Sequence, residues 1–246
     1  EDKPDYQRVW ARNRINKPED GIRLENPYFF GCNSFIDSEI GRVLDAAQQY
    51  APDALIIYTS DHGDMLSSHS LWAKGSAAYE EITHIPFMMM GAGLPSGKVD
   101  ALPVSHLNLM PTILELMGTE IPQTVEGKSL VPQMVSGERV NDYVFIEFGR
   151  YETDHDGFGG YQPMRAVFDG RYKLSINLLS TDELYDLKTD LGELINRIDD
   201  PAYREIRNRL HDALLNEMYR TRDPFRGYYW ERRPWRTDAP DASWDD

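Results

Sequence analysis

Two side chains suited to metal binding lie next to each other in the chain, directly after a short apolar run. Asp61 and His62 follow the sequence ALIIYTS at 54–60, and Gly63 lets the backbone turn sharply behind them. A carboxylate and an imidazole can together ligate a divalent cation, and open α/β sheets bind ligands where buried strands end. The pattern equally fits an ordinary strand-end turn in which Asp61 caps the next segment.

A lysine twelve positions further along could bind an anion. Lys74 stands in the apolar and aromatic stretch LWAKG at 71–75, where an ammonium loses solvation unless an anion compensates it. A lysine is a suitable point charge for a sulfate or phosphate oxygen. A surface lysine whose aliphatic stem packs on Trp72 would explain the same pattern without a ligand. Three further candidate groups lie nearby in the sequence: Asp64, His69 and His84.

The composition limits the class of protein. The chain has 246 residues, 41% of them hydrophobic, and none of its apolar runs approaches the roughly 18 residues of a membrane span. It carries 26 Lys and Arg residues against 41 Asp and Glu residues, and this net charge of −15 disfavours binding to nucleic acid or an anionic membrane. The single cysteine, Cys32, rules out an internal disulfide and a cysteine-based zinc site. We expect a soluble protein without nucleic-acid or membrane partners; the compartment stays open between cytoplasm and periplasm.

Apolar periodicity predicts an α/β unit in the first part of the chain. Three short apolar runs without alternation are typical of strands buried on both faces of a parallel sheet, and stretches with helical spacing lie among them. The expected strands cover 54–59, 85–90 and 143–148, and the expected helices run from about residue 36 to Tyr50 and from Pro111 to Gly118.

The pattern changes after about Pro163. Apolar runs at 165–168 and 171–176 flank the turn Asp169-Gly170 and predict a β-hairpin, to which 184–187 would add a third antiparallel strand. A helix from about Ala202 would cover this small sheet. We therefore expect three regions, namely an α/β core over 1–162, an antiparallel sheet with a helix over 163–225, and a tail over 226–246.

Several landmarks, taken in order, resemble the sulfatases of the alkaline-phosphatase superfamily and the related phosphonate monoester hydrolases. The most specific is the stretch from Tyr58 to Lys74, followed by YEEITHIP at 79–86. Further matches are the helix at 28–45, LMPTIL at 109–114, GKSL at 127–130, RYK at 171–173 and LYDL at 184–187. The resemblance implies the C-terminal part of a mostly parallel sheet with flanking helices, plus a small antiparallel sheet and helix subdomain.

The resemblance also implies roles for individual residues. Asp61 and His62 match the pair that ligates the active-site cation, and Lys74 matches the lysine that holds the sulfate ester. His69 and His84 lie in matching stretches and are candidate catalytic residues. The family points to Ca²⁺, although an imidazole ligand leaves Mn²⁺, Mg²⁺ and Zn²⁺ open. The segment 105–108, SHLN, stands where the family often has an Asp.

The family's nucleophile motif does not occur in this sequence. The family carries Cys/Ser-x-Pro-x-Arg near its N-terminus, and its Cys or Ser is oxidised to formylglycine. Cys32 lacks the following Pro and Arg, so we expect it to be a small buried hydrophobe in the family's helix. Because the chain starts at Glu1 without this motif, we expect it to be the C-terminal half of a sulfatase, inactive by itself, with the nucleophile and the other metal ligands in an N-terminal half.

These observations predict hydrolysis of a small-molecule or carbohydrate sulfate ester. A phosphodiesterase or phosphonate monoester hydrolase of the same superfamily is the alternative, and a non-catalytic fragment or subunit is a third. The expected partners are the missing N-terminal half and, as an option, a second copy of the protein in a homo-oligomer. The loop at 151–162 is expected to shape the substrate pocket, and the Arg- and Trp-rich tail to lie along the body or at a subunit contact.

Overall fold

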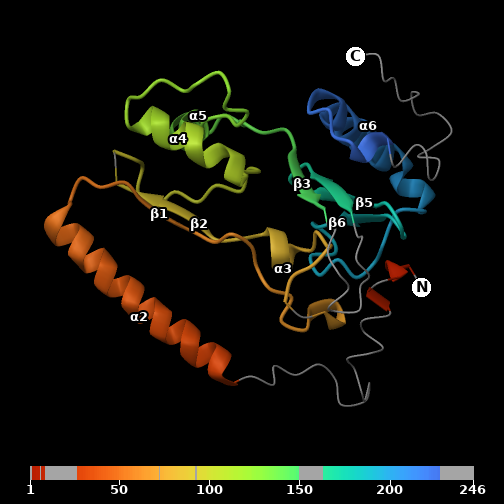
Figure 1. The fold of residues 1–246 in the computed structure, drawn as a ribbon, viewed down its shortest axis with the longest axis horizontal. Coiled ribbons are helices and arrows are strands. Elements are labelled where there is room, and N and C mark those ends of the chain that lie inside the picture. The colour runs from red at the N-terminus through yellow and green to blue at the C-terminus, as the bar shows by residue number, and fades with distance from the viewer. Residues whose placement is uncertain are drawn as a thin grey trace.

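A computed structural model describes residues 2–5, 7–8, 27–71, 73–91, 93–149 and 163–227. Two antiparallel sheets and five helices make up this part of the chain, and one helix, α2, lies apart from the rest (Figure 1). The helices are α2 (Pro27–Tyr50), α3 (Glu80–Thr83), α4 (Leu109–Leu116), α5 (Val131–Ser136) and α6 (Arg204–Arg220). The strands are β1 (Ile56–Thr59), β2 (Phe87–Met90), β3 (Val144–Phe148), β4 (Met164–Phe168), β5 (Tyr172–Asn177) and β6 (Glu183–Asp186).

The four-stranded sheet and α6 form the main hydrophobic core. The strands lie in the order β3-β4-β5-β6, all antiparallel, and α6 covers one face (Figure 1). The predicted hairpin is confirmed as β4 and β5, where Asp169 Oδ1 accepts the backbone N–H groups of Arg171 (2.8 Å) and Tyr172 (2.7 Å). The core joins apolar residues of strands and helix that are at most 2% exposed, among them Val167, Leu174, Ile176, Leu184, Leu210 and Leu214.

Strand β3 belongs to this sheet, which corrects the expectation that 143–148 is a third parallel strand of the core. It pairs antiparallel with β4, from Val144 opposite Phe168 to Phe148 opposite Met164. Its side chains are apolar toward both faces because Phe145 packs on the core under α6 while Ile146 and Phe148 pack on the opposite side. The expected boundary at 162/163 falls outside the described residues and stays a prediction.

Strands β1 and β2 form a separate two-stranded sheet, and the parallel, fully buried arrangement expected for them is wrong. They pair antiparallel, with Ile57 opposite Met89, and Tyr58, Met88 and Met90 are 41%, 59% and 56% exposed. An apolar run without alternation indicates cover on both faces, but it carries no information about the direction of the neighbouring strand.

Helix α2 corrects two further expectations. It begins at Pro27, before the expected start near residue 36, because proline is well suited to the first turn of a helix. Cys32 is exposed rather than buried, since α2 lies apart from the other elements (Figure 1). No helix among the described residues is both long and apolar enough to span a membrane.

Replacing Leu210 by alanine tests the core beneath α6. The side chain is fully buried, so truncation leaves a cavity, and we expect the free energy of unfolding to fall by about 2–5 kcal/mol. Leu191→Ala is the control, because Leu191 is 70% exposed and its loss should change stability by less than about 0.5 kcal/mol. Urea unfolding of both variants measures the difference; equal losses would contradict this assignment of the core.

Candidate metal and anion site

The two candidate metal ligands lie in the loop that follows β1. The Asp61 side chain is 83% exposed, and its Oδ2 lies 3.4 Å from His62 Nε2. The backbone N–H of His62 donates to Asp61 Oδ1 at 2.9 Å, and this bond, with help from the nearby imidazole and Ser60, holds the pKa of Asp61 below its ordinary value. Asp61 is therefore a carboxylate at neutral pH, as a metal ligand must be.

The imidazole of His62 is oriented by its own loop. Its Nδ1 lies 2.8 Å from the carbonyl oxygen of Gly63, so Nδ1 carries the proton and Nε2 keeps the lone pair. Histidines that ligate metals commonly donate their other ring N–H to a carbonyl in this way. The lone pair of Nε2 and the carboxylate of Asp61 face the same space, and their separation suits two ligands of one cation at about 2.3 Å each.

Lys74 approaches the imidazole of His62 from the next segment. Its Nζ lies 2.7 Å from His62 Nε2, and the side chain is exposed. The preceding residue, Ala73, has a left-handed backbone with φ of 57°, which turns the chain at this point. The structure thus brings together Asp61, His62 and Lys74, the three residues singled out as metal and sulfate ligands.

The loop is packed backbone to backbone against α3. The N–H of Gly63 donates to the carbonyl oxygen of Ile82 at 2.8 Å, and a Cβ at position 63 would lie 1.8 Å from the carbonyl oxygen of Glu81. Only glycine fits there without a shift of the backbone. The position of α3 therefore sets the position of Asp61 and His62.

A contact that the sequence analysis did not identify supports the loop from its other side. His106 Nε2 donates to the carbonyl oxygen of Ser60 at 2.8 Å. The segment at 105–108 is held in shape by buried Asn108, which accepts the N–H of Ser105 (2.8 Å) and donates to the carbonyl of Lys128 (2.8 Å). The available signal for a helix start at this place was Ser105, because serine is a preferred N-cap residue.

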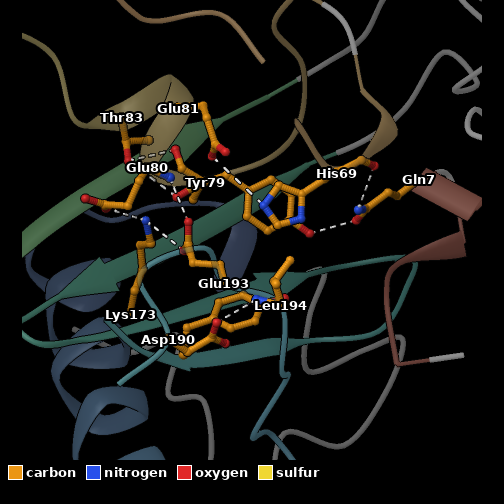
Figure 2. Close-up of polar contacts among 12 residues, drawn as sticks. Gln7, His69, Tyr79, Glu80, Glu81, Thr83, Lys173, Asp190, Glu193 and Leu194 are labelled. Carbon is orange, nitrogen blue, oxygen red and sulfur yellow. Dashed lines mark hydrogen bonds and ion pairs between the residues drawn. The ribbon is translucent and has the colours of Figure 1, made fainter. Parts of the chain in front are cut away.

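The other two candidate histidines have different surroundings. The His69 side chain is 3% exposed and stacks on Tyr79, with ring centres 3.9 Å apart (Figure 2). Its burial lowers its pKa. His84 is 76% exposed and lies 3.0 Å from Glu80 Oε2. Asp64 accepts the N–H of Leu66 at 2.9 Å, as in a turn.

An open cleft of about 1750 Å³ lies beside the loop at 60–64, which we call the metal loop because it carries the two candidate ligands. Asp61, His62 and Lys74 line it together with His84 and His106, and residues of β2 and β3 form other walls. His69 is not among the residues that line it. The cleft gives a substrate direct access to the exposed carboxylate, imidazole and ammonium. The loop at 151–162, expected to shape a pocket, lies outside the described residues.

Comparison with known families identifies the chain. The family profile described as Sulfatase matches residues 8–119, and the one described as N-sulphoglucosamine sulphohydrolase, C-terminal, matches residues 68–220. The chain belongs to the sulfatase family. The resemblance inferred from the sequence is thereby confirmed. Sulfatases generally use a divalent metal ion; among the residues that the structure describes, no group of three or more His, Cys, Asp or Glu could hold one.

Individual sulfatases match over most of this chain. An uncharacterized sulfatase, YidJ of Escherichia coli K12, is 41% identical over 96% of this chain and 47% of its own length. A Δ4,5-hexuronate-2-O-sulfatase of Bacteroides thetaiotaomicron is 31% identical over 71% of this chain and 36% of its own. A solved phosphonate monoester hydrolase of Silicibacter pomeroyi is similar with a TM-score of 0.64 and 32% identity, over 75% of this chain and 39% of that one. The chain thus spans less than half the length of these relatives.

Replacing Gly63 by alanine tests the packing of the loop on α3. Because the new methyl group would meet the Glu81 carbonyl, we expect the free energy of unfolding to fall by about 1–3 kcal/mol. Gly41→Ala is the control, since nothing lies within 4 Å of the new Cβ and alanine favours the helix by about 0.5–1 kcal/mol. Chemical unfolding of both variants measures the effect; a Gly63→Ala protein as stable as the parent would contradict the close approach.

The buried position of His69 predicts a pH dependence of stability. Its pKa is lowered by burial from the ordinary 6.5, so below pH 6.5 the unfolded chain binds the proton more readily than the folded one. The contribution of the neutral His69 ring to the free energy of unfolding should therefore be complete above pH 6.5. It should decrease on acidification, by at most about 1.4 kcal/mol per pH unit. The difference in unfolding free energy between the parent and His69→Asn, measured from pH 7.5 to 5, should shrink as the pH falls. A constant difference would show that His69 does not titrate in this way.

Proposed function

We propose that this chain is the C-terminal portion of a sulfuric ester hydrolase and supplies part of its active site. Asp61 and His62 would ligate a divalent cation, and Lys74 would bind the sulfate group. The observation that carries the proposal is the convergence of these side chains at the cleft, with His62 Nε2 3.4 Å from Asp61 Oδ2 and 2.7 Å from Lys74 Nζ. The nucleophile, a formylglycine in the family, would lie outside this chain.

The donor set fits a divalent cation. Asp61 offers a carboxylate with a lowered pKa, and His62 offers an Nε2 lone pair because its Nδ1–H is bonded to the Gly63 carbonyl. We propose Ca²⁺. Mg²⁺ is an alternative that carboxylate ligands favour, and Mn²⁺ and Zn²⁺ are alternatives that an imidazole ligand favours. A cation held there would neutralise charge on the oxygens of the sulfate group. Two ligands are too few for such ions, so further ligands would come from the N-terminal half.

Lys74 would hold the anion beside the cation. In the structure its ammonium donates to the lone pair of His62 Nε2. A cation bound to that lone pair would displace the ammonium, which would then bind the sulfate oxygens. Its side chain is exposed and free of the core, so this rotation costs little packing. Lys74 would then stabilise the charge that develops on the nonbridging oxygens during hydrolysis.

Carbohydrate sulfates are the substrates that the comparisons favour. One relative, 31% identical over 71% of this chain, is named as a hexuronate-2-O-sulfatase. The likeness to a phosphonate monoester hydrolase supports the alternative reaction on phosphorus. His69, with its stacked and buried ring, is a weaker catalytic candidate than His84, which faces the cleft. The homo-oligomer stays a prediction.

Substitutions in the full-length protein test these roles. Asp61→Ala should remove both metal and activity, because the cation loses its charged ligand. Lys74→Ala should keep the metal and slow turnover by roughly 10²–10³-fold, the usual cost of one preorganised contact to developing charge. Metal content, and initial rates on an aryl sulfate and on a phosphonate monoester, measure both effects and separate the two reactions.

Lys128→Ala provides the matched control, since Lys128 is exposed and is not among the residues that line the cleft. It should have the metal content and rate of the parent. A Lys74→Ala enzyme with the parent's activity would show that Lys74 is an ordinary surface lysine. An Asp61→Ala enzyme with a full complement of metal would place the cation elsewhere.

A further inference from the structure

A buried group of charges joins the four-stranded sheet to α3. Lys173 Nζ, on β5, lies 2.7 Å from Glu80 Oε1 and 2.9 Å from Glu193 Oε1 (Figure 2). The side chains of Lys173 and Glu193 are 2% and 1% exposed. Burial raises the pKa of Glu193 to about 7 against the attraction of Lys173, so a carboxylate is costly at this place. The attraction of Lys173 to the two carboxylates offsets part of this cost.

The second oxygen of Glu193 holds the start of α3. Glu193 Oε2 accepts the backbone N–H of Glu80, the first residue of α3, at 2.7 Å. A helix of four residues has little stability of its own, so its place depends on such contacts. Tyr79 provides another, because its hydroxyl donates to Glu183 Oε1 on β6 at 2.7 Å.

The backbone around Glu193 is strained in a way that fixes its carboxylate. Glu193 has φ of 50°, in the left-handed region that non-glycine residues seldom adopt. The surrounding turn enforces this conformation, since the Asp190 carboxylate accepts the N–H groups of Leu194 (3.1 Å) and Ile195 (2.8 Å). Lys3 Nζ donates to the Glu193 carbonyl at 2.6 Å. Several contacts hold this unfavourable backbone conformation. This indicates that the fold requires the Glu193 carboxylate at its present position.

The other end of the connection is the metal loop. The carbonyl oxygen of Ile82, in α3, accepts the N–H of Gly63 at 2.8 Å, and the two backbones are in contact at Glu81. A displacement of α3 would therefore move Gly63, whose carbonyl fixes the ring of His62. Contacts thus run without a gap from Glu193 through α3 to the candidate metal ligands.

We propose that Glu193 is a positioning residue for the metal site at Asp61 and His62. It anchors α3 to the sheet and thereby holds the loop in the arrangement that binds the cation. The inference rests on the proposed function, because it assumes that the loop binds a metal. The affinity for the metal would thus depend on a turn that lies more than a hundred residues further along the chain.

The test uses the full-length protein and Ca²⁺ as the probe. Glu193→Ala removes the acceptor for the Glu80 N–H, so we expect Ca²⁺ affinity to fall by about 10–100-fold, with a lower kcat. Glu193→Gln keeps a side-chain oxygen for this N–H and should recover most of the affinity. Titration of the metal-free enzymes with Ca²⁺, well below their melting temperatures, gives the affinities.

Leu210→Ala separates positioning from stability. It destabilises the same sheet from the α6 side without touching α3, so it should lower the melting temperature and leave Ca²⁺ affinity and kcat of the folded enzyme unchanged. If Glu193→Ala does not fold, Glu193→Asp replaces it: the charge stays beside Lys173, but the shorter side chain no longer reaches the Glu80 N–H, and affinity should still fall.

A folded Glu193→Ala or Glu193→Asp enzyme with the parent's Ca²⁺ affinity and kcat would overturn the inference. Asp61→Ala is measured in parallel. If Asp61→Ala loses Ca²⁺ while the Glu193 variants keep it, only the positioning role is wrong. If Asp61→Ala binds Ca²⁺ like the parent, the proposed metal site itself is wrong.

Discussion

A lysine ammonium that is almost fully buried must be neutralised where it lies, and this requirement organises the described part of the molecule. Lys173 lies near the start of the inner strand β5, where it meets Glu193 from the turn after β6 and Glu80 from α3. The pairing unites elements that are distant in the sequence. It also fixes the distance between the sheet and the segment on which the metal loop rests.

The metal loop in turn depends on close backbone contact. Gly63 lets the loop approach α3 so nearly that no side chain fits between them, and the Gly63 carbonyl then sets the imidazole of His62. The left-handed backbone conformation of Ala73 precedes Lys74, whose side chain contacts the same imidazole. The three candidate ligands therefore lie at the edge of one cleft for two reasons. The buried ion pairs of Lys173 hold α3, and Gly63, which has no Cβ, lets the loop pack closely on α3.

Local sequence signals predicted the hairpin of β4 and β5, the strand β6 and the helix α6. They also marked Asp61, His62 and Lys74 as candidates, and the resemblance to sulfatases then implied their roles. Each signal depends on neighbours in the chain: the Asp169-Gly170 turn, the helical spacing near Leu210, and the Asp-His-Gly triplet. The direction of β1 against β2, the place of β3 and the exposure of Cys32 could not be predicted, because they depend on which segment lies alongside. The support from His106 and Glu193 was missed for the same reason, since both act over long separations.

The Lys173 pairing has a consequence for the order of folding. Strands β4, β5 and β6 follow one another closely and α6 is the next helix, so their contacts close shorter loops and cost less chain entropy than the contact with α3. The contact between Lys173 and Glu80 joins residues 93 positions apart, and its buried charges gain their stabilisation only once the sheet excludes water around them. We therefore expect the sheet to fold before α3 docks, so that the metal loop acquires its final shape in a late step of folding.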